Sequence, residues 1–156
     1  MTTATDASIT EVPASPSTVA DIMVPDVVTL RLEQTLHDGH ELMRDHRVRH
    51  VPVLDNQGLL VGLLNQKAVL REALRIADEY GTHRLSHYLK QVPLTDVISR
   101  DFPQLSVDTP LTEAGELLLA RKQGALPILD DGRLVGIVSS VDFVRLAMRL
   151  LEPSID

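Results

Sequence analysis

The stretch LPILDDGRLVGIVSSVD, residues 126–142, decides the fold of this chain. Two runs of branched aliphatic residues, LPIL and LVGIV, flank residues 130–132, where a glycine with positive φ would favour a tight turn. The stretch therefore predicts a β-hairpin. Directly after it, Ser139 and Asp142 stand three residues apart, where the pattern changes to an amphipathic helix.

The start of this predicted helix is a candidate nucleotide site. Free backbone N–H groups and the positive end of the helix dipole can hold an anion there, while a hydroxyl and a carboxylate can hold sugar hydroxyls. The pair Ser139 and Asp142 is also the pattern of a capping box, in which both side chains only satisfy the helix end. Both interpretations stay open, and the same two side chains can serve both purposes.

Composition limits the classes of function. With 156 residues, 44% of them hydrophobic, the chain is long enough for one well-buried domain. The net charge of −7 and the lack of a dense basic run argue against nucleic-acid binding. No cysteine is present, so disulfides and thiol chemistry are excluded. With two Phe, two Tyr and no Trp, a flat ligand would be held between aliphatic side chains. The apolar runs are too short for a membrane span and no signal peptide fits, so a cytoplasmic protein is expected.

An internal duplication organises the chain. Leu36 and Leu111 are 75 positions apart, and so are the PVLD and PILD segments that begin at Pro52 and Pro127. After the hairpin turn the offset becomes 74, because the second turn is one residue shorter. A constant offset across several elements indicates a true repeat. Each copy reads β-α-β-β-α, so the fold class is α+β of the α/β type, with the two copies packed through their sheets about a pseudo-twofold axis.

The expected domain organisation follows from this repeat. The boundaries are a flexible N-terminal tail over 1–17, a first repeat over 18–80, a helical connector over 81–93 and a second repeat over 94–152. Within the first repeat, the pattern predicts a strand over 27–32, a helix over 34–46, a hairpin with its turn at 56–58 and a helix over 66–80. In the connector, Gly81 should end that helix and Thr82 should cap a short one.

The two repeats, each with a hydrophobic-Pro-hydrophobic-hydrophobic-Asp strand and a Val-Gly strand, resemble a tandem pair of cystathionine-β-synthase (CBS) domains, the arrangement called a Bateman module. The resemblance covers roughly residues 18–152 as one module. It implies a stand-alone regulatory protein and not an enzyme. Its expected ligand is an adenosine-containing nucleotide such as AMP, ADP, ATP or S-adenosylmethionine, with no required cofactor. It also implies a homodimer, head to head or head to tail.

The family's nucleotide motif stands in full at residues 136–142, GIVSSVD, where the resemblance implies that Asp142 holds the ribose hydroxyls and Ser139 contacts ribose or phosphate. The first copy, GLLNQKA at residues 62–68, has Asn65 and Ala68 instead, so one competent site is expected. The resemblance also implies that the first repeat supplies the walls of that site, with a basic corner suited to phosphate. The residues implied are Met23, Asp26, Val28, Arg47, Val48, Arg49 and His50.

Two other interpretations remain at this stage. The chain could be a ligand-free interaction scaffold whose dimer surface matters, which the altered first motif favours. The spacings of His37 with His40 and of His83 with His87 could suit a metal, but without a third ligand we expect surface histidines and no metal site. No nucleophile-base pair is visible, and no motif identifies a regulated partner.

Overall fold

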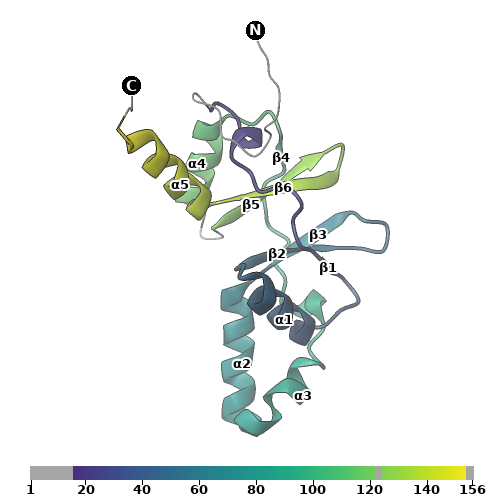
Figure 1. Ribbon diagram of the computed structural model, residues 1–156. Coiled ribbons are helices and arrows are strands. Elements are labelled where there is room, and N and C mark those ends of the chain that lie inside the picture. Colours follow the sequence, from purple (N-terminus) through teal and green to yellow (C-terminus); the bar gives the residue numbers. More distant parts are fainter. Residues whose placement is uncertain (1–15, 122–123, 154–156) are drawn as a thin grey trace.

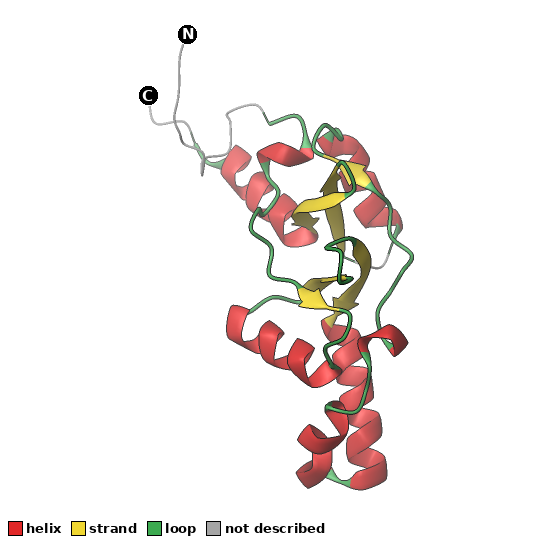
Figure 2. Cartoon of the chain, turned by 90° about the vertical axis from the view of Figure 1, so that its right-hand side faces the viewer, coloured by secondary structure: helices red, strands yellow, loops and turns green. Residues whose placement is uncertain are grey.

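Two β-α-β-β-α units make up the computed structural model, which describes residues 16–121 and 124–153. Each unit contains a three-stranded sheet. The strands of both units lie in the middle of the molecule, and the helices lie toward its two ends (Figures 1 and 2). The predicted fold class and the pairing of the repeats through their sheets are confirmed.

In the first half, the sheet order is β1-β2-β3, with β1 parallel and β3 antiparallel to β2. The elements of this half, with the helical connector that follows it, are a 3₁₀ turn η1 (Val19–Asp21), β1 (Leu30–Arg31), α1 (Leu36–His46), β2 (His50–Leu54), β3 (Leu60–Asn65), α2 (Gln66–Tyr80), a 3₁₀ turn η2 (Thr82–Arg84) and α3 (Leu85–Leu89).

The second half repeats this arrangement, with sheet order β4-β5-β6 and the same pattern of parallel and antiparallel pairs. Its elements are a 3₁₀ turn η3 (Leu94–Asp96), β4 (Leu105–Ser106), α4 (Leu111–Ala120), β5 (Ala125–Asp130), β6 (Arg133–Ser139) and α5 (Ser140–Leu151). None of the helices in the described part of the chain combines the length and the apolar character needed to cross a lipid bilayer.

The predicted hairpin is confirmed as β5 and β6. Its two turn residues, Asp131 and Gly132, have φ values of 55° and 80°. Two consecutive positive φ values are what a two-residue hairpin turn that follows the twist of the strands requires, and Asp-Gly is a preferred pair for it. The turn brings Ser139, at the end of β6, opposite Ala125 at the start of β5.

The leading segment of each repeat packs on the other repeat. Val19 is fully buried in the core of the second half, and Leu94 is fully buried in the core of the first. Backbone bridges join Val24 to Ile137 and Leu63 to Ser99, which are equivalent pairs under the repeat offset. The two halves are therefore tied together by crossed segments as well as by their sheets.

Several predicted boundaries differ from the observed ones. Strand 27–32 shortens to β1, and helix 34–46 begins later, at Leu36, because Thr35 is its N-cap. In the connector Gly81 does end α2, with φ 90°, but Thr82 is the first residue of a 3₁₀ turn and caps no helix.

The last residues of the tail expected over residues 1–17 are held by hydrogen bonds. Residues 1–15 of it lie outside the described residues, but Ser17 is already bonded on both sides. Its N–H donates to Oδ2 of Asp21 at 2.8 Å, and its carbonyl accepts from the N–H of Leu111 at 3.0 Å. The N-terminal segment is thus anchored on α4 from Ser17 onward.

Connector helix α3 covers one side of the first core. Leu89 is buried in that core, and Leu85, Tyr88 and Val92 pack against it. The ring of Tyr88 stacks on Tyr80 of α2, with 3.9 Å between the ring centroids. The connector therefore covers one edge of the first half.

Candidate ligand site between the repeats

The candidate site centres on the junction of β6 and α5. Asp142 is 8% exposed, the lowest exposure of any charged residue in the described chain. Its Oδ2 accepts a hydrogen bond from the backbone N–H of Ser139 at 2.8 Å and lies 3.2 Å from Ser139 Oγ. The capping box allowed by the sequence is therefore present. Its burial and the hydrogen bond from Ser139 together hold the carboxylate in one orientation.

The second oxygen of Asp142 is placed differently. Its Oδ1 lies 3.8 Å from Nη1 of Arg145, which is longer than a hydrogen bond. Among residues 16–121 and 124–153, no donor makes a hydrogen bond to Oδ1, so this oxygen can accept one from a ligand hydroxyl. Capping and ligand binding can thus use different oxygens of the same side chain.

The corresponding junction of the first repeat has no carboxylate. Asn65 is the N-cap of α2, and its Oδ1 accepts from the N–H of Ala68 at 2.8 Å. Ala68, at the position equivalent to Asp142, is buried in the first core. The amide oxygen is used by the cap and the methyl group offers no acceptor, so the two junctions differ chemically.

The crossed leading segment brings Met23 onto the second repeat. A Cβ built on Gly136 would lie 2.6 Å from Sδ of Met23 and 3.1 Å from the carbonyl oxygen of Val24. Only a glycine permits this approach. Val24 and Ile137 exchange backbone hydrogen bonds at 2.9 and 3.0 Å, which fixes the segment beside β6.

His50 reaches the second repeat from the other side. Its ring lies 3.3 Å from the Cβ position of Gly124, whose carbonyl accepts from the N–H of Ser140 at 3.2 Å. The imidazole is therefore next to the backbone that leads into α5. Burial lowers the pKa of His50 below its ordinary value of 6.5, and the charges of Arg49 and Lys67 lower it further.

The other predicted wall residues lie on the same two segments. Asp26 is exposed with φ 53°, and Val28 is partly buried. Arg47 ends α1 in the left-handed conformation, with φ 55°. Val48 packs against the core of its own repeat, and Arg49 is exposed, with its carbonyl accepting from the N–H of Gln66 at 2.9 Å. The structure brings Met23 and His50 to the second repeat, while a ligand role for any of the seven stays a prediction.

Lys67 is a residue that the sequence interpretation missed. Its charge acts on His50. It follows the start of α2 directly, and the register of the sheet pairs His50 with Asn65. The available signal was its position in the altered first motif, GLLNQKA at residues 62–68, where a base directly precedes the Ala68 that replaces the acid. Lys67 and Arg49 are thus the two cations whose charges act on His50, while a basic corner made of Arg47, Arg49 and His50 stays a prediction.

The pKa shift of His50 predicts a pH-dependent stability. Below about pH 6.5 the unfolded chain takes up this proton before the folded chain does, so the free energy of unfolding should decrease as the pH falls. The decrease should end below the folded-state pKa. NMR titration of the imidazole should give a midpoint below 6.5, and Lys67→Gln should raise it. A midpoint above 6.5 would contradict this account, and the His50→Gln variant identifies the resonance.

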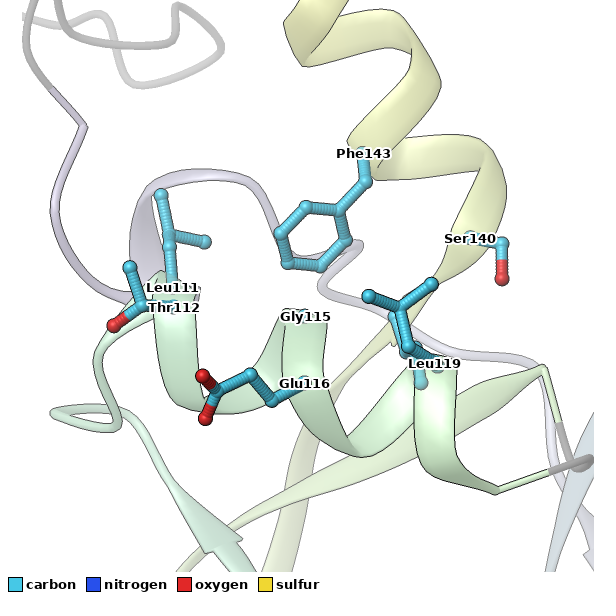
Figure 3. A pocket seen from close by; sticks show the side chains of 8 residues that line it. Leu111, Thr112, Gly115, Glu116, Leu119, Ser140 and Phe143 are labelled. Atoms are coloured by element: carbon cyan, nitrogen blue, oxygen red, sulfur yellow. The ribbon is translucent and has the colours of Figure 1, made fainter.

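A separate apolar groove lies between α4 and α5. It has a volume of about 580 Å³, and Figure 3 shows the Phe143 ring above Gly115 with Leu111 and Leu119 at either end. It contains none of the nine predicted nucleotide-binding residues. However, two residues that line the groove, Ser140 and Phe143, directly follow the predicted ligand residues Ser139 and Asp142 in the sequence.

Metal binding receives no support from the geometry. Among the described residues, no group of three His, Cys, Asp or Glu side chains could hold a metal ion. His37 instead lies 3.7 Å from Glu41 on α1, and the Nε2 atom of His87 lies 3.0 Å from the side chain of Gln91.

The chain is similar to two CBS domain-containing proteins over most of their length. A CBS domain-containing protein of Dictyostelium discoideum is 29% identical over 150 residues, which cover 86% of this chain and 94% of that protein. The CBS domain-containing protein YhcV of Bacillus subtilis is 31% identical over 127 residues, with 81% and 82% covered. By contrast, the chain spans 15% of the A-adding tRNA nucleotidyltransferase of Aquifex aeolicus, to which it is 29% identical over 134 residues. Some relatives are thus enzymes that carry this unit as a part.

Two solved structures are similar to the chain over nearly their whole length. A putative acetoin utilization protein (AcuB) from Vibrio cholerae matches with a TM-score of 0.71 and 30% identity, covering 87% of this chain and 98% of that one. CBSX2 in complex with AMP matches with a TM-score of 0.68 and 27% identity, covering 86% and 98%. The family model of the CBS domain matches residues 19–85 and 94–149. The chain, with its two crossed repeats, therefore belongs to the CBS domain family.

Proposed function

We propose that this chain is a regulatory module that binds an adenosine-containing nucleotide between its repeats, with Asp142 holding the ribose hydroxyls. The observation that carries the proposal is the position of Asp142. Its carboxylate is buried and fixed by the cap, and its Oδ1 keeps acceptor capacity. A hydrogen bond to a charged group contributes about 1.5–3 kcal/mol, so a ribose with two hydroxyls gains substantially from such an acceptor.

The charges around the junction support an anionic ligand part. Arg47, Arg49 and Lys67 supply cations, and no acidic residue lies in the first turn of α2. The similarity to CBSX2, which was solved with AMP, agrees with a nucleotide monophosphate as one candidate. ADP, ATP and S-adenosylmethionine belong to the same proposal, as does a single competent site. The module itself carries out no reaction in this proposal.

The same proposal includes a way to transmit binding. Ser139 and Asp142 would contact the ligand, while Ser140 and Phe143 line the α4–α5 groove. All four residues lie at the N-terminal end of α5, with Ser139 as its N-cap. A ligand that shifts this end of the helix would change the groove and the surface beside it, so a homodimer formed there would respond to the nucleotide.

Thermal melting with AMP, ADP, ATP and S-adenosylmethionine tests this function. A ligand at 100 times its dissociation constant adds about 2.7 kcal/mol of stability, which corresponds to a rise in Tm of roughly 5–10 °C for a chain of this size. The Asp142→Ala variant should lose most of that rise, since each lost charge-assisted hydrogen bond weakens binding by roughly 10-fold to 150-fold.

A matched control separates ligand binding from helix capping. Asp38 makes the same capping box at α1, where its Oδ2 accepts from the Thr35 N–H at 3.0 Å. Asp142→Ala and Asp38→Ala should each cost about 0.5–2 kcal/mol of stability through the lost cap. Only Asp142→Ala should abolish the ligand response. An equal response in both variants would exclude Asp142 from the site.

A ligand-free scaffold is the second candidate function. It is favoured by the hydrogen bond that the Asp142 carboxylate accepts from the Ser139 N–H and by the loss of the acid in the first repeat. This candidate predicts no thermal shift with any of the four ligands, while the oligomeric state stays the same.

A further inference from the structure

The connector between the repeats presents a basic surface in an acidic chain. From Tyr80 to Thr95 the sequence has no aspartate or glutamate, whereas the whole chain carries a net charge of −7. Arg84 and Lys90 supply the two cations of this segment, and both residues are exposed. The potential at this surface therefore differs in sign from that of the chain as a whole. The connector face, as we name it, comprises Tyr80, Arg84, His87, Tyr88 and Lys90.

The connector face stands on a fixed base. Leu89 of α3 is 3% exposed, and Leu85 and Val92 pack beside it on the first core. Helix α3 and the C-terminal end of α2 lie at one end of the molecule, away from the strands of both sheets (Figures 1 and 2). The face is therefore an ordered surface that is remote from the Asp142 junction at the start of α5.

Aromatic rings hold the guanidinium of Arg84. Its Cζ atom lies 5.4 Å from the centroid of the Tyr88 ring, within the range of a cation–π contact. Tyr88 stacks on Tyr80 with 15° between the ring planes, and the His87 ring meets Tyr88 edge-on with 5.0 Å between centroids. A guanidinium on the face of a ring keeps the N–H donors at its edge available for a planar acceptor. Arg84 is therefore oriented before any partner binds.

The two cations of the connector face have no carboxylate within ion-pair distance in the part of the chain that the structure describes. The neighbouring arginine of α2 is different, because Arg75 pairs with Glu72 at 3.1 Å and with Glu79 at 3.5 Å. Glu79 also makes a hydrogen bond with Tyr80 that raises the pKa of the phenol, so this acid already has two partners. The uncompensated cations therefore favour an acidic ligand.

We propose that the connector face docks an acidic segment of another protein. A carboxylate of that segment accepts two hydrogen bonds from the oriented guanidinium of Arg84, and Lys90 adds attraction at the rim. An apolar side chain of the segment packs on Tyr80, which is 39% exposed. This docking goes beyond nucleotide binding and depends neither on a nucleotide nor on Asp142. Its test is carried out without nucleotide, so that its failure and the failure of ligand binding are distinguishable.

Two peptides test the chemistry of the partner. One alternates pairs of glutamates with leucine, and the other has glutamine in place of every glutamate. In fluorescence anisotropy, the fluorescein-labelled Glu peptide should bind the full chain saturably, and the Gln peptide should bind at least about 10-fold more weakly because the charge-assisted hydrogen bonds are lost. No saturable binding of the Glu peptide, or equal binding of both peptides, would overturn the proposal.

A pair of matched substitutions tests the residue. Arg84→Gln should weaken binding of the Glu peptide at least about 10-fold, and Arg84→Lys should restore only part of it, since an ammonium cannot form the bidentate pair. Arg133→Gln removes the same charge from an exposed position at the start of β6 and should change the binding little. Equal losses for Arg84→Gln and Arg133→Gln would mean a general charge effect and overturn the proposal.

Tyrosine fluorescence locates the bound peptide. The chain has no tryptophan, and its two tyrosines, Tyr80 and Tyr88, both belong to the connector face. The unlabelled Glu peptide should therefore change the tyrosine emission of the wild type and of Arg133→Gln, but not that of Arg84→Gln. Binding without a change in emission would place the peptide elsewhere and overturn the proposal. An equal change with a single-stranded oligonucleotide of the same charge would indicate a nucleic-acid partner and overturn it as well.

Discussion

Leu94→Ala is expected to lower the free energy of unfolding by about 2–5 kcal/mol, the usual cost of removing a fully buried leucine side chain. Leu94 precedes the second repeat in the sequence, yet it is fully buried in the core of the first. The substitution should therefore destabilise a core that lies upstream in the chain. Urea unfolding followed by circular dichroism gives the free energy, provided that a single transition is seen.

The control for this prediction is Leu70→Ala, the same chemical change at a residue that is 57% exposed on α2. It should alter the stability by no more than about 0.5 kcal/mol. If Leu94 were only a linker residue, both variants would behave alike. A loss below about 1 kcal/mol for Leu94→Ala would therefore be incompatible with the crossed segments.

Gly136→Ala is expected to cost about 1–3 kcal/mol, because an added methyl group has no space. Its carbon would lie 3.1 Å from the carbonyl oxygen of Val24, which cannot move without breaking its hydrogen bond to the N–H of Ile137. It would also displace Met23, a predicted wall of the ligand site. Thermal and urea unfolding should both show the loss.

The matched control, Gly115→Ala, should have the opposite sign. At this position the nearest atom to a built Cβ is 3.5 Å away, an ordinary contact. Gly115 lies inside α4, where alanine is favoured over glycine by about 0.5–1 kcal/mol. If both variants were equally stable, the close approach of the leading segment to β6 would not constrain the fold.

Much of this architecture could be predicted from the sequence because it depends on local patterns. The turn at Asp131 and Gly132, the end of α2 at Gly81 and the start of α5 after Ser139 all follow from the conformational preferences of a few adjacent residues. The constant offset between the repeats then fixed which elements correspond. These features need no knowledge of long-range contacts.

The crossing of the leading segments could not be derived from the offset. The repeat relates Thr18 to Pro93 and Thr35 to Pro110, but it is equally satisfied whether each segment packs on its own copy or on the other. The observed bridges join Thr18 to Pro110 and Thr35 to Pro93. Only the resemblance to the CBS family suggested that Met23 belongs with the second repeat.

The site was predicted in outline, and its details depended on the three-dimensional arrangement. The sequence left capping and ligand binding open for Asp142, and the observed bond from Ser139 establishes the cap while the ligand role stays a prediction. Lys67 was missed because its effect on His50 depends on the pairing of β2 with β3. The α4–α5 groove depends on how two helices pack, which periodicity alone does not determine.

The crossed leading segments also decide what the smallest autonomous unit is. A fragment ending at Tyr80 would lack Leu94, and a fragment beginning at Leu94 would lack Val19, so each excised half would leave a gap in its interior. Neither CBS repeat should fold when expressed by itself. Mixing the two fragments should restore native structure, since each carries the leading segment that completes the core of the other. A gene fusion should therefore include both repeats.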